Sequence, residues 1–136
     1  MNGIGIIYWS GTGNTQAMAE AMAEAIQAEA TAVSGITAEA AAAYDRLLLG
    51  CPAMGAEVLE EDEFEPFFAA LEPHLAGKRV ALFGSYGWGD GEWMREWESR
   101  VQAAGAILFE QGLIINETPD AAGLAECRAF AGRFAA

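Results

Sequence analysis

The chain alternates short, almost continuous apolar runs with longer stretches in which apolar residues recur every three or four positions. The first pattern is typical of a strand that is covered on both faces, and the second of an amphipathic helix. Strands and helices that alternate in this way form a parallel sheet with helices on both faces. We therefore predict a doubly wound α/β fold, in which ligands bind beyond the carboxyl ends of the strands.

Five apolar runs are predicted to be strands, and the segments between them to be helices. The predicted strands span residues 4–9, 32–33, 47–51, 80–83 and 106–115. The predicted helices span residues 18–26, 39–43, 64–75, 93–101 and 124–134. We expect the fourth strand to break at Gly84 and the fifth to bulge or bend at Gly112. These elements fill the chain, so we expect residues 1–136 to form one domain.

The acidic composition restricts the partners of the protein. Twenty Asp and Glu residues against seven Lys and Arg give a formal net charge of −13. This charge repels nucleic acids and anionic membranes and favours basic protein surfaces. No apolar run approaches the roughly 20 residues that span a bilayer. Cys51 and Cys127 match no metal or dithiol motif and no signal peptide is evident, so we expect free thiols in a cytoplasmic protein, which we also expect to be a monomer.

The first predicted strand leads into a loop, residues 10–15, that combines three hydroxyl side chains, an asparagine and two glycines. Such donors, with the positive end of the next helix, can bind one terminal phosphate without a cation. The loop lacks the lysine of a Walker A motif and the glycine spacing of a dinucleotide fingerprint. A plain helix cap is the alternative, but a cap needs only one hydroxyl. Trp9 ends the strand, so we expect it in the core, within reach of this loop.

The loop after the third predicted strand, residues 51–57, contains a methionine that no periodicity explains. Met54 offers a polarisable apolar side chain to a ligand. Gly55 permits the positive φ that a type II′ turn over residues 54–57 needs at its second position. A plain strand-to-helix connection, with Met54 folded over the core, explains the same residues equally well.

The loop after the fourth predicted strand, residues 85–91, places Trp88 between two glycines, where it has no helix or strand face to pack on. A large ring at the ligand edge indicates stacking on a planar ligand, and the glycines let the backbone approach that ligand. Tyr86 fits either the core or the ligand site. The spacing of Trp93 and Trp97 predicts core positions instead.

The three loops together describe a site for a flat aromatic cofactor with one phosphate, and FMN fits this description. Residues 8–15 (YWSGTGNT), 50–55 (GCPAMG) and 84–89 (GSYGWG) resemble the three FMN loops of the short-chain flavodoxins, particularly those of anaerobic bacteria. The resemblance covers essentially the whole chain in order. The last predicted strand has no room for the insertion that marks long-chain flavodoxins.

The resemblance implies a flavodoxin-like fold: a three-layer, doubly wound, five-stranded parallel sheet with strand order 2-1-3-4-5. It implies that Met54 and Trp88 cover the two faces of the isoalloxazine ring, that Glu57 accepts a hydrogen bond from the ring N3–H, and that Gly89 offers backbone N–H groups near the pyrimidine edge. The implied phosphate ligands are the side chains of Ser10, Thr12, Asn14 and Thr15 and the backbone of Gly11 and Gly13. The complete implied cofactor-binding set is Ser10, Gly11, Thr12, Gly13, Asn14, Thr15, Pro52, Ala53, Met54, Gly55, Ala56, Glu57, Ser85, Tyr86, Gly87, Trp88, Gly89, Asp90 and Gly91.

Two positions depart from the pattern of some relatives. Pro52 stands where some have a serine, which removes one phosphate donor. Ala56 stands where others have Asp, Ser or Gly, which alters how readily the adjacent peptide turns over. Both departures are expected to change the redox potentials and to leave FMN binding intact. Asn116, at the end of the last strand, corresponds only weakly to a ribityl contact.

The function that the resemblance implies is that of a low-potential one-electron carrier, not an enzyme, whose non-covalently bound FMN cycles mainly between semiquinone and hydroquinone. The implied flip of the Gly55–Ala56 peptide adds one hydrogen bond, worth about 0.5–1.5 kcal/mol. Repulsion from several carboxylates opposes the second electron by more, about a few kcal/mol in total. The acidic run at residues 60–63, with Glu65, is either a solvated face or a docking rim for basic redox partners.

Other proteins of this architecture have different functions, and each of those functions needs residues that this chain lacks. An FMN-dependent quinone or azo reductase is the alternative, but the chain shows no extra loops to build a substrate pocket. A response-regulator receiver needs an Asp where Cys51 and Pro52 stand, and a low-molecular-weight phosphatase needs an Arg where Glu57 follows Cys51. His74 is the only histidine and lies near a predicted helix end, so no acid–base apparatus is evident.

Overall fold

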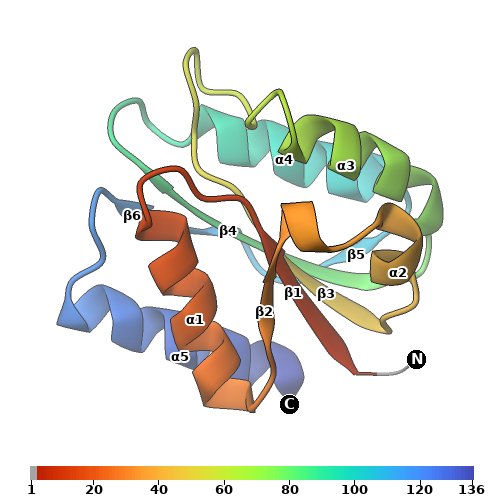
Figure 1. The fold of residues 1–136 in the computed structure, drawn as a ribbon, viewed down its shortest axis with the longest axis horizontal. Coiled ribbons are helices and arrows are strands. Elements are labelled where there is room, and N and C mark those ends of the chain that lie inside the picture. Colours follow the sequence, from red (N-terminus) through yellow and green to blue (C-terminus); the bar gives the residue numbers. More distant parts are fainter. Residues whose placement is uncertain (1–2) are drawn as a thin grey trace.

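The computed structural model describes residues 3–136, which form a parallel β-sheet with helices around it (Figure 1). The strands are β1 (Ile4–Tyr8), β2 (Ala30–Ala32), β3 (Arg46–Gly50), β4 (Arg79–Tyr86), β5 (Ile107–Leu108) and β6 (Leu113–Asn116). Their order is β2-β1-β3-β4-β5, and β6 also pairs with β4. All of these pairs are parallel. The predicted doubly wound strand order is confirmed.

Helices cover both faces of the sheet (Figure 1). They are α1 (Asn14–Ile26), α2 (Ala38–Ala42), α3 (Phe64–Leu71), α4 (Glu92–Ala103) and α5 (Ala121–Ala135), with short 3₁₀ turns at Val33–Gly35 and Glu72–His74. α1 and α5 pack on one face, and α2, α3 and α4 pack on the other, so that an apolar core lies on each side of the sheet. The predicted three-layer arrangement is confirmed.

The strand β3 shows why a continuous apolar run becomes a central strand here. Leu47, Leu48 and Leu49 are all completely buried. Successive side chains of a strand point to opposite faces of the sheet. Leu47 and Leu49 accordingly join the core beneath α3 and α4, whereas Leu48 joins the core beneath α1 and α5. A strand between two helical layers therefore needs an apolar residue at every position.

Two predicted strands were wrong in their extent. β4 does not break at Gly84 but continues to Tyr86. The glycine is needed there for close approach, because a Cβ atom at Gly84 would collide with the carbonyl oxygen of Cys51. The last strand is not continuous: it divides into β5 and β6 around residues 109–112, where Glu98 Oε2 accepts a hydrogen bond of 2.6 Å from Gly112 N.

Smaller differences concern element ends. The second strand lies at Ala30–Ala32, slightly before its predicted place, and is followed directly by a 3₁₀ turn. The helix predicted to reach residue 75 ends as α-helix at Leu71. It continues as the 3₁₀ turn that contains Pro73, a residue that lacks the N–H needed to extend an α-helix.

The carboxyl ends of the strands are tied together just beyond the sheet. Trp9 N donates to Gly50 O at 3.0 Å, and Ala53 N donates to Ser85 O at 3.0 Å. Glu117 N, after β6, donates to the carbonyl oxygen at the end of β4 at 2.7 Å. The pairing of the sheet thus extends into the connecting loops. It holds the three loops that the sequence singled out, residues 10–15, 51–57 and 85–91, at one edge of the molecule.

Candidate functional site

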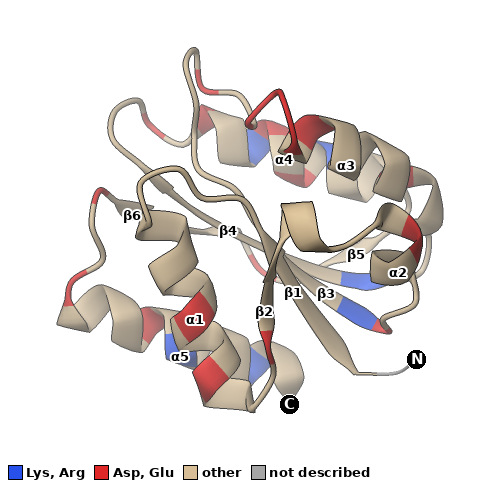
Figure 2. Cartoon of the chain, viewed as in Figure 1, with Lys and Arg blue, Asp and Glu red and all other residues tan. Residues whose placement is uncertain are grey.

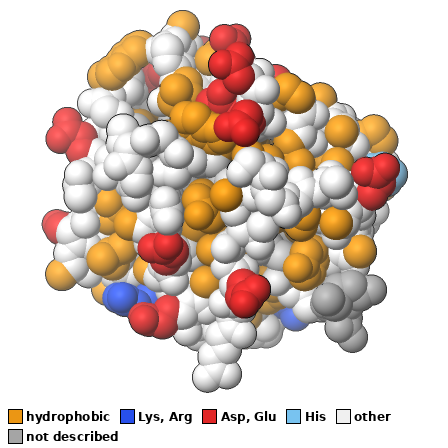
Figure 3. Space-filling model, in the orientation of Figure 1, with side chains coloured by type: hydrophobic (Ala, Val, Ile, Leu, Met, Phe, Trp, Pro, Cys, Tyr) orange, Lys and Arg blue, Asp and Glu red, His pale blue; other side chains and the backbone are white. Residues whose placement is uncertain are grey.

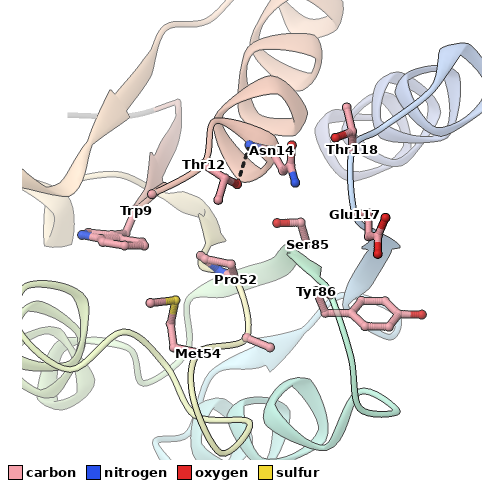
Figure 4. Close-up of a pocket in the computed structure, with 12 residues that line it drawn as sticks. Trp9, Thr12, Asn14, Pro52, Met54, Ser85, Tyr86, Glu117 and Thr118 are labelled. Atoms are coloured by element: carbon pink, nitrogen blue, oxygen red, sulfur yellow. Dashed lines mark hydrogen bonds between the residues drawn. The ribbon is translucent and has the colours of Figure 1, made fainter.

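A cavity of about 370 Å³ opens at this edge between the three loops. Its walls come from all three and from the segment after β6, as Figure 4 shows. The lining residues are Trp9, Gly11, Thr12, Asn14, Pro52, Ala53, Met54, Ser85, Tyr86, Gly87, Glu117 and Thr118. One end of the cavity is bordered by the polar loop that precedes α1, and much of the remaining wall is apolar.

The loop at residues 10–15 turns tightly into the start of α1. Ser10 Oγ accepts hydrogen bonds from Gly13 N at 3.1 Å and Gln16 N at 3.2 Å, which fold the loop over the start of α1. Gly13 precedes the helix with φ +96°, a conformation that suits glycine. α1 has no side-chain cap and no acidic residue in its first turn. Its positive end therefore faces the cavity without a built-in carboxylate.

Thr15 lies behind this loop rather than in the cavity wall. Its side chain is 1% exposed, and its Oγ1 lies 2.9 Å from Ser85 Oγ. Ser85 N also donates to Thr15 Oγ1 at 3.3 Å. The pair joins the first turn of α1 to the end of β4, so the polar end of the cavity and its third loop form one unit.

The loop at residues 51–57 makes a narrow turn that presents Met54 to the cavity (Figure 4). Met54 N donates to Val58 O at 2.8 Å, and Val58 N donates to Met54 O at 3.0 Å. The turn therefore closes at Val58, one residue later than the expected turn over residues 54–57. Gly55 has φ +48°, the positive value that was expected, and Glu57 also has a positive φ, +56°.

Glu57 connects this turn to the loop at residues 85–91. Its Oε1 accepts hydrogen bonds from Gly91 N at 3.2 Å and Glu92 N at 3.0 Å, which are donors at the start of α4. Gly89 packs so closely on this carboxylate that a Cβ atom there would collide with it. The second carboxylate oxygen, Oε2, makes no hydrogen bond with any described residue and is free to accept one.

The third loop places its two aromatic residues differently. Tyr86 lines the cavity and packs on Trp93, with ring centroids 5.7 Å apart. Trp88 is 65% exposed and is not among the residues that line the cavity. Trp93 and Trp97 are each 1% exposed, which confirms their predicted core positions. Asp90 points away to an exposed ion pair with Arg95 at 3.1 Å.

Glu117 and Thr118 were missed by the sequence analysis. Both line the cavity (Figure 4), and Glu117 adopts a φ of +58° that non-glycine residues rarely take. Their place directly after the last strand, at the ligand edge, was the available signal. Asn116, the residue proposed there instead, turns its side-chain amide to Tyr86 O at 3.3 Å and does not line the cavity.

The acidic run before α3 is not one uniform surface. Glu60 is 6% exposed, and its carboxylate accepts hydrogen bonds from the backbone N–H groups of Asp62, Glu63 and Phe64 at 2.8–2.9 Å. Burial alone would raise the pKa of this carboxyl, but the three N–H groups outweigh it and the pKa is lowered. Glu60 is therefore the cap of α3, a structural carboxylate.

The other members of the run have separate partners. Glu63 Oε1 accepts a hydrogen bond of 2.9 Å from Trp9 Nε1. Glu65 forms a two-pronged ion pair with Arg100, at 2.7 and 2.8 Å. The side chains of Glu61 and Asp62 make no hydrogen bond or ion pair with the described residues. Within the acidic run, only these two are unengaged carboxylates at the surface.

Positive charge is scarce around the cavity. Six of the seven Lys and Arg side chains bind a carboxylate or a backbone carbonyl within residues 3–136: Arg46, Lys78, Arg95, Arg100, Arg128 and Arg133. Figure 2 shows that several basic residues gather at the starts of β3 and β4, opposite the ligand edge. No Lys or Arg lines the cavity. The polar groups that line the cavity are therefore neutral donors and acceptors and the carboxylate of Glu117.

Neither thiol of the chain is a reactive group. Cys51 and Cys127 are free and buried, as predicted. Burial raises the pKa of Cys51 above its usual range and that of Cys127 to about 12, so both remain protonated thiols. The described residues contain no group of three or more His, Cys, Asp or Glu placed to hold a metal ion. Within the same range, no helix combines the length and hydropathy of a membrane span.

Comparison with known proteins agrees with this geometry. A family profile described as "Flavodoxin" matches residues 6–130. A flavodoxin of Clostridium beijerinckii is 49% identical over 122 residues, which are 86% of this chain and 88% of that protein. A flavodoxin of Megasphaera elsdenii is 49% identical over 128 residues, or 90% and 91% of the two chains. The solution structure of two-electron reduced Megasphaera elsdenii flavodoxin superposes with a TM-score of 0.83 and 45% identity, covering 96% of this chain and 99% of that one.

Proposed function

The chain belongs to the flavodoxin family, and we propose that the cavity at the carboxyl edge of its sheet is the site where it binds FMN. It is an FMN-binding electron carrier that serves redox partner proteins, and not an enzyme that turns over a substrate of its own. The observation that carries the site assignment is the cavity itself, which joins a cation-free anion loop to an apolar wall.

The loop at residues 10–15 fits the phosphate of FMN. Ser10 already orders two backbone N–H groups at the start of α1, and Thr12 and Asn14 face the cavity. Thr12 and Asn14 side chains, Ser10 and the backbone of Gly11 and Gly13 are proposed as donors to the phosphate. The positive end of α1 adds the equivalent of about half an elementary charge. Thr15 is proposed to contribute from behind the loop, through its hydroxyl, which is hydrogen-bonded to the hydroxyl of Ser85 at 2.9 Å.

The remainder of the cavity fits the flavin ring. Pro52, Ala53 and Met54 form the wall on the second loop, and Tyr86 and Gly87 form the wall on the third. We propose that Met54 covers one face of the ring, and that Trp88, which stands exposed beside the cavity, closes over the other. Glu57 Oε2 is proposed to accept the ring N3–H, while Oε1 stays bound to the start of α4.

Bound FMN supplies one-electron redox chemistry, and the protein sets the potentials. The chain contributes a turn that can rearrange, because Gly55 has open space around its α-carbon and both Gly55 and Ala56 are exposed. It contributes negative charge as well, since Glu117 lines the cavity, Glu57 belongs to the loop that carries Met54, and no Lys or Arg of residues 3–136 lines the cavity. We expect this charge to disfavour further electron uptake and to lower the second one-electron potential.

We propose that redox partners dock with basic side chains on the acidic surface beside the cavity. Glu61 and Asp62 line a second hollow, of about 380 Å³, that shares Met54 with the cavity. Acidic and apolar side chains lie together on this part of the surface (Figure 3). The exposed side chains of Val58 and Trp88 provide apolar contact area nearby. Complementary charge accelerates association more than it strengthens the final complex.

We further propose that residues 1–136 act as a single domain and as a monomer in the cytoplasm, without nucleic-acid or membrane partners. The single sheet shared by both cores supports the first statement, and the net charge of −13 supports the last. The protonated, buried thiols suit a reducing compartment. Light scattering of the purified protein measures the oligomeric state directly.

The site assignment is tested by a titration of the apoprotein with FMN. We expect one FMN per chain, quenched flavin fluorescence, and a loss of affinity of roughly tenfold or more when Thr12 is replaced by alanine. An equal loss for riboflavin, which lacks the phosphate, would contradict the assignment of Thr12.

The docking proposal is tested with cytochrome c as a lysine-rich electron acceptor. E61Q with D62N should flatten the salt dependence of the transfer rate, and E126Q, on α5, should not.

A further inference from the structure

We propose that Glu63 is a positioning residue of the FMN site, which holds the ring of Trp9 in place as a wall of the cavity. The inference rests on the proposed function and extends it to a residue that the acidic run would otherwise assign to docking. Its geometric basis is the hydrogen bond of 2.9 Å from Trp9 Nε1 to Glu63 Oε1, which joins positions 54 residues apart in the chain.

The ring of Trp9 is fixed on two sides. It lines the cavity, where it lies on the same side as Met54 (Figure 4). Gly11 packs against it so closely that a Cβ atom at Gly11 would lie 2.9 Å from the ring carbon Cη2. The indole thus rests on the backbone of the anion loop, and Glu63 holds its polar edge. A wall held in this way is ordered before the ligand arrives, which reduces the entropy cost of binding.

The backbone at each end of this contact is itself anchored. Trp9 N donates to Gly50 O at 3.0 Å, next to the end of β3. Glu63 N donates to the capping carboxylate of Glu60 at 2.8 Å, and Glu63 O accepts from Phe67 N at 3.2 Å. The side chain of Glu63 does not cap α3, so it is free to reach Trp9. The hydrogen bond between the two side chains therefore connects two residues whose backbones are held by other hydrogen bonds.

The residue types suit this role. An indole N–H can only donate, and an ionised carboxylate is a strong acceptor for it. The neighbouring carboxylates of Glu61 and Asp62 have no such partner among the described residues, which separates Glu63 from them. Glutamine at position 63 keeps an acceptor oxygen and removes the charge. Alanine removes both, and these two variants distinguish positioning from electrostatics.

The experiment measures dissociation constants of FMN and riboflavin for the wild type, W9F, E63Q, E63A and W9F/E63A, by quenching of flavin fluorescence. E126A, which removes an exposed carboxylate on α5, is the control. We expect E63A and W9F each to weaken both ligands by about three- to tenfold, since a wall of the ring site acts on both. The dissociation constants of E63Q and E126A should stay within about twofold of the wild-type value. Because Trp9 and Glu63 act through one contact, the dissociation constant of W9F/E63A should be at most about twice that of the single variant that binds less tightly. The indole N–H resonance of Trp9, identified by its loss in W9F, should shift in E63A and persist in E63Q.

Each other result overturns the inference. If E63A binds flavin as tightly as E126A does, Glu63 does not position the site. If E63Q binds flavin as weakly as E63A does, the charge of Glu63 matters and not its hydrogen bond. A loss confined to FMN places Trp9 in the phosphate loop alone. If E63A fails to fold, as its urea midpoint would show, W9F, E63Q and the Trp9 resonance still decide. A wild-type protein that binds neither flavin refutes the proposed function, whereas tight wild-type binding with unchanged variants refutes only the role of Glu63.

Discussion

Replacement of Glu60 by glutamine is predicted to destabilise the segment that connects the Met54 turn to α3. Glu60 Oε1 accepts hydrogen bonds from Glu63 N and Phe64 N, both at 2.8 Å, and Oε2 accepts one from Asp62 N at 2.9 Å. Glutamine retains one acceptor oxygen but turns its NH₂ group toward a backbone N–H. Two donors then face each other in a site where the native side chain is only 6% exposed.

The cost follows from these contacts. A lost hydrogen bond to a charged group is worth about 1.5–3 kcal/mol, and the lost negative charge at the start of α3 adds about 0.3–1 kcal/mol. We expect E60Q to lower the free energy of unfolding by about 2–4 kcal/mol and the melting temperature by roughly 6–15 °C. Glu61 is exposed and has no partner among the described residues, so E61Q should change stability by at most about 0.5 kcal/mol.

The effect should also depend on pH. The pKa of Glu60 is lower in the folded protein than its ordinary value of 4.5. Its stabilising contribution is therefore complete at neutral pH and is lost as the pH falls below that value through the folded pKa. Urea unfolding of the apoprotein at pH 7 and at about pH 4 measures this. The reasoning is refuted if E60Q matches E61Q at pH 7, or if its deficit does not shrink in acid.

Three further substitutions test other parts of the structure. Arg100→Ala removes the ion pairs with Glu65 and Glu72 and the contact with the Phe68 ring at 4.8 Å, and should destabilise by about 1–2 kcal/mol in urea unfolding, with less loss for Arg100→Lys. Gly84→Ala should lower the free energy of unfolding by about 2 kcal/mol or more and weaken FMN binding, because its Cβ would collide with Cys51 O. Gly132→Ala, on the exposed surface of α5 with open space around it, should instead raise the free energy of unfolding by about 0.5–1 kcal/mol. Equal effects of the two substitutions would contradict the close approach at Gly84. Glu117→Gln should raise the second one-electron potential of bound FMN by about 20–40 mV in a redox titration at low salt, whereas Glu39→Gln on α2 should leave it unchanged, and a lowered potential would contradict the charge argument.

The fold was predictable because its signals are local. Leu47, Leu48 and Leu49 predict a strand with two covered faces whatever surrounds them, and the structure buries all three. The three loops were identified because glycines, hydroxyls and unpaired aromatic residues break the strand and helix periodicity. The topology then brings their positions to one edge, since the carboxyl ends of parallel strands coincide.

The contacts that the sequence analysis missed are long-range. The acidic run at residues 60–63, with Glu65, looks uniform in sequence. Its division depends on Trp9, which lies 54 residues from Glu63, and on Arg100, which lies 35 residues from Glu65. No periodicity reports such pairs. Charge repetition alone therefore does not distinguish the carboxylates that have partners from Glu61 and Asp62, which have none among the described residues.

The extent of β4 and of the last strand depends on similarly distant groups. Gly84 looks like a strand breaker, yet β4 continues through it, and the missing Cβ leaves room for the carbonyl oxygen of Cys51. The bulge or bend predicted at Gly112 lies close to the split between β5 and β6, but the positive φ there belongs to Glu110, and the N–H of Gly112 donates to Glu98 on α4. Both glycines leave room for a neighbour from a distant segment, since a Cβ atom at Gly84 would collide with Cys51 O and one at Gly112 with the side chain of Met94.

The most direct test of the account is a phosphorus-31 NMR titration of the FMN-loaded protein from about pH 5 to pH 8. The second proton of a free phosphate monoester binds near pH 6. If the loop at residues 10–15 encloses the phosphate with neutral donors at the positive end of α1, the bound resonance should keep the chemical shift of the dianion across this range. A bound resonance that titrates as free FMN does would place the phosphate in solvent and contradict the assignment of the site.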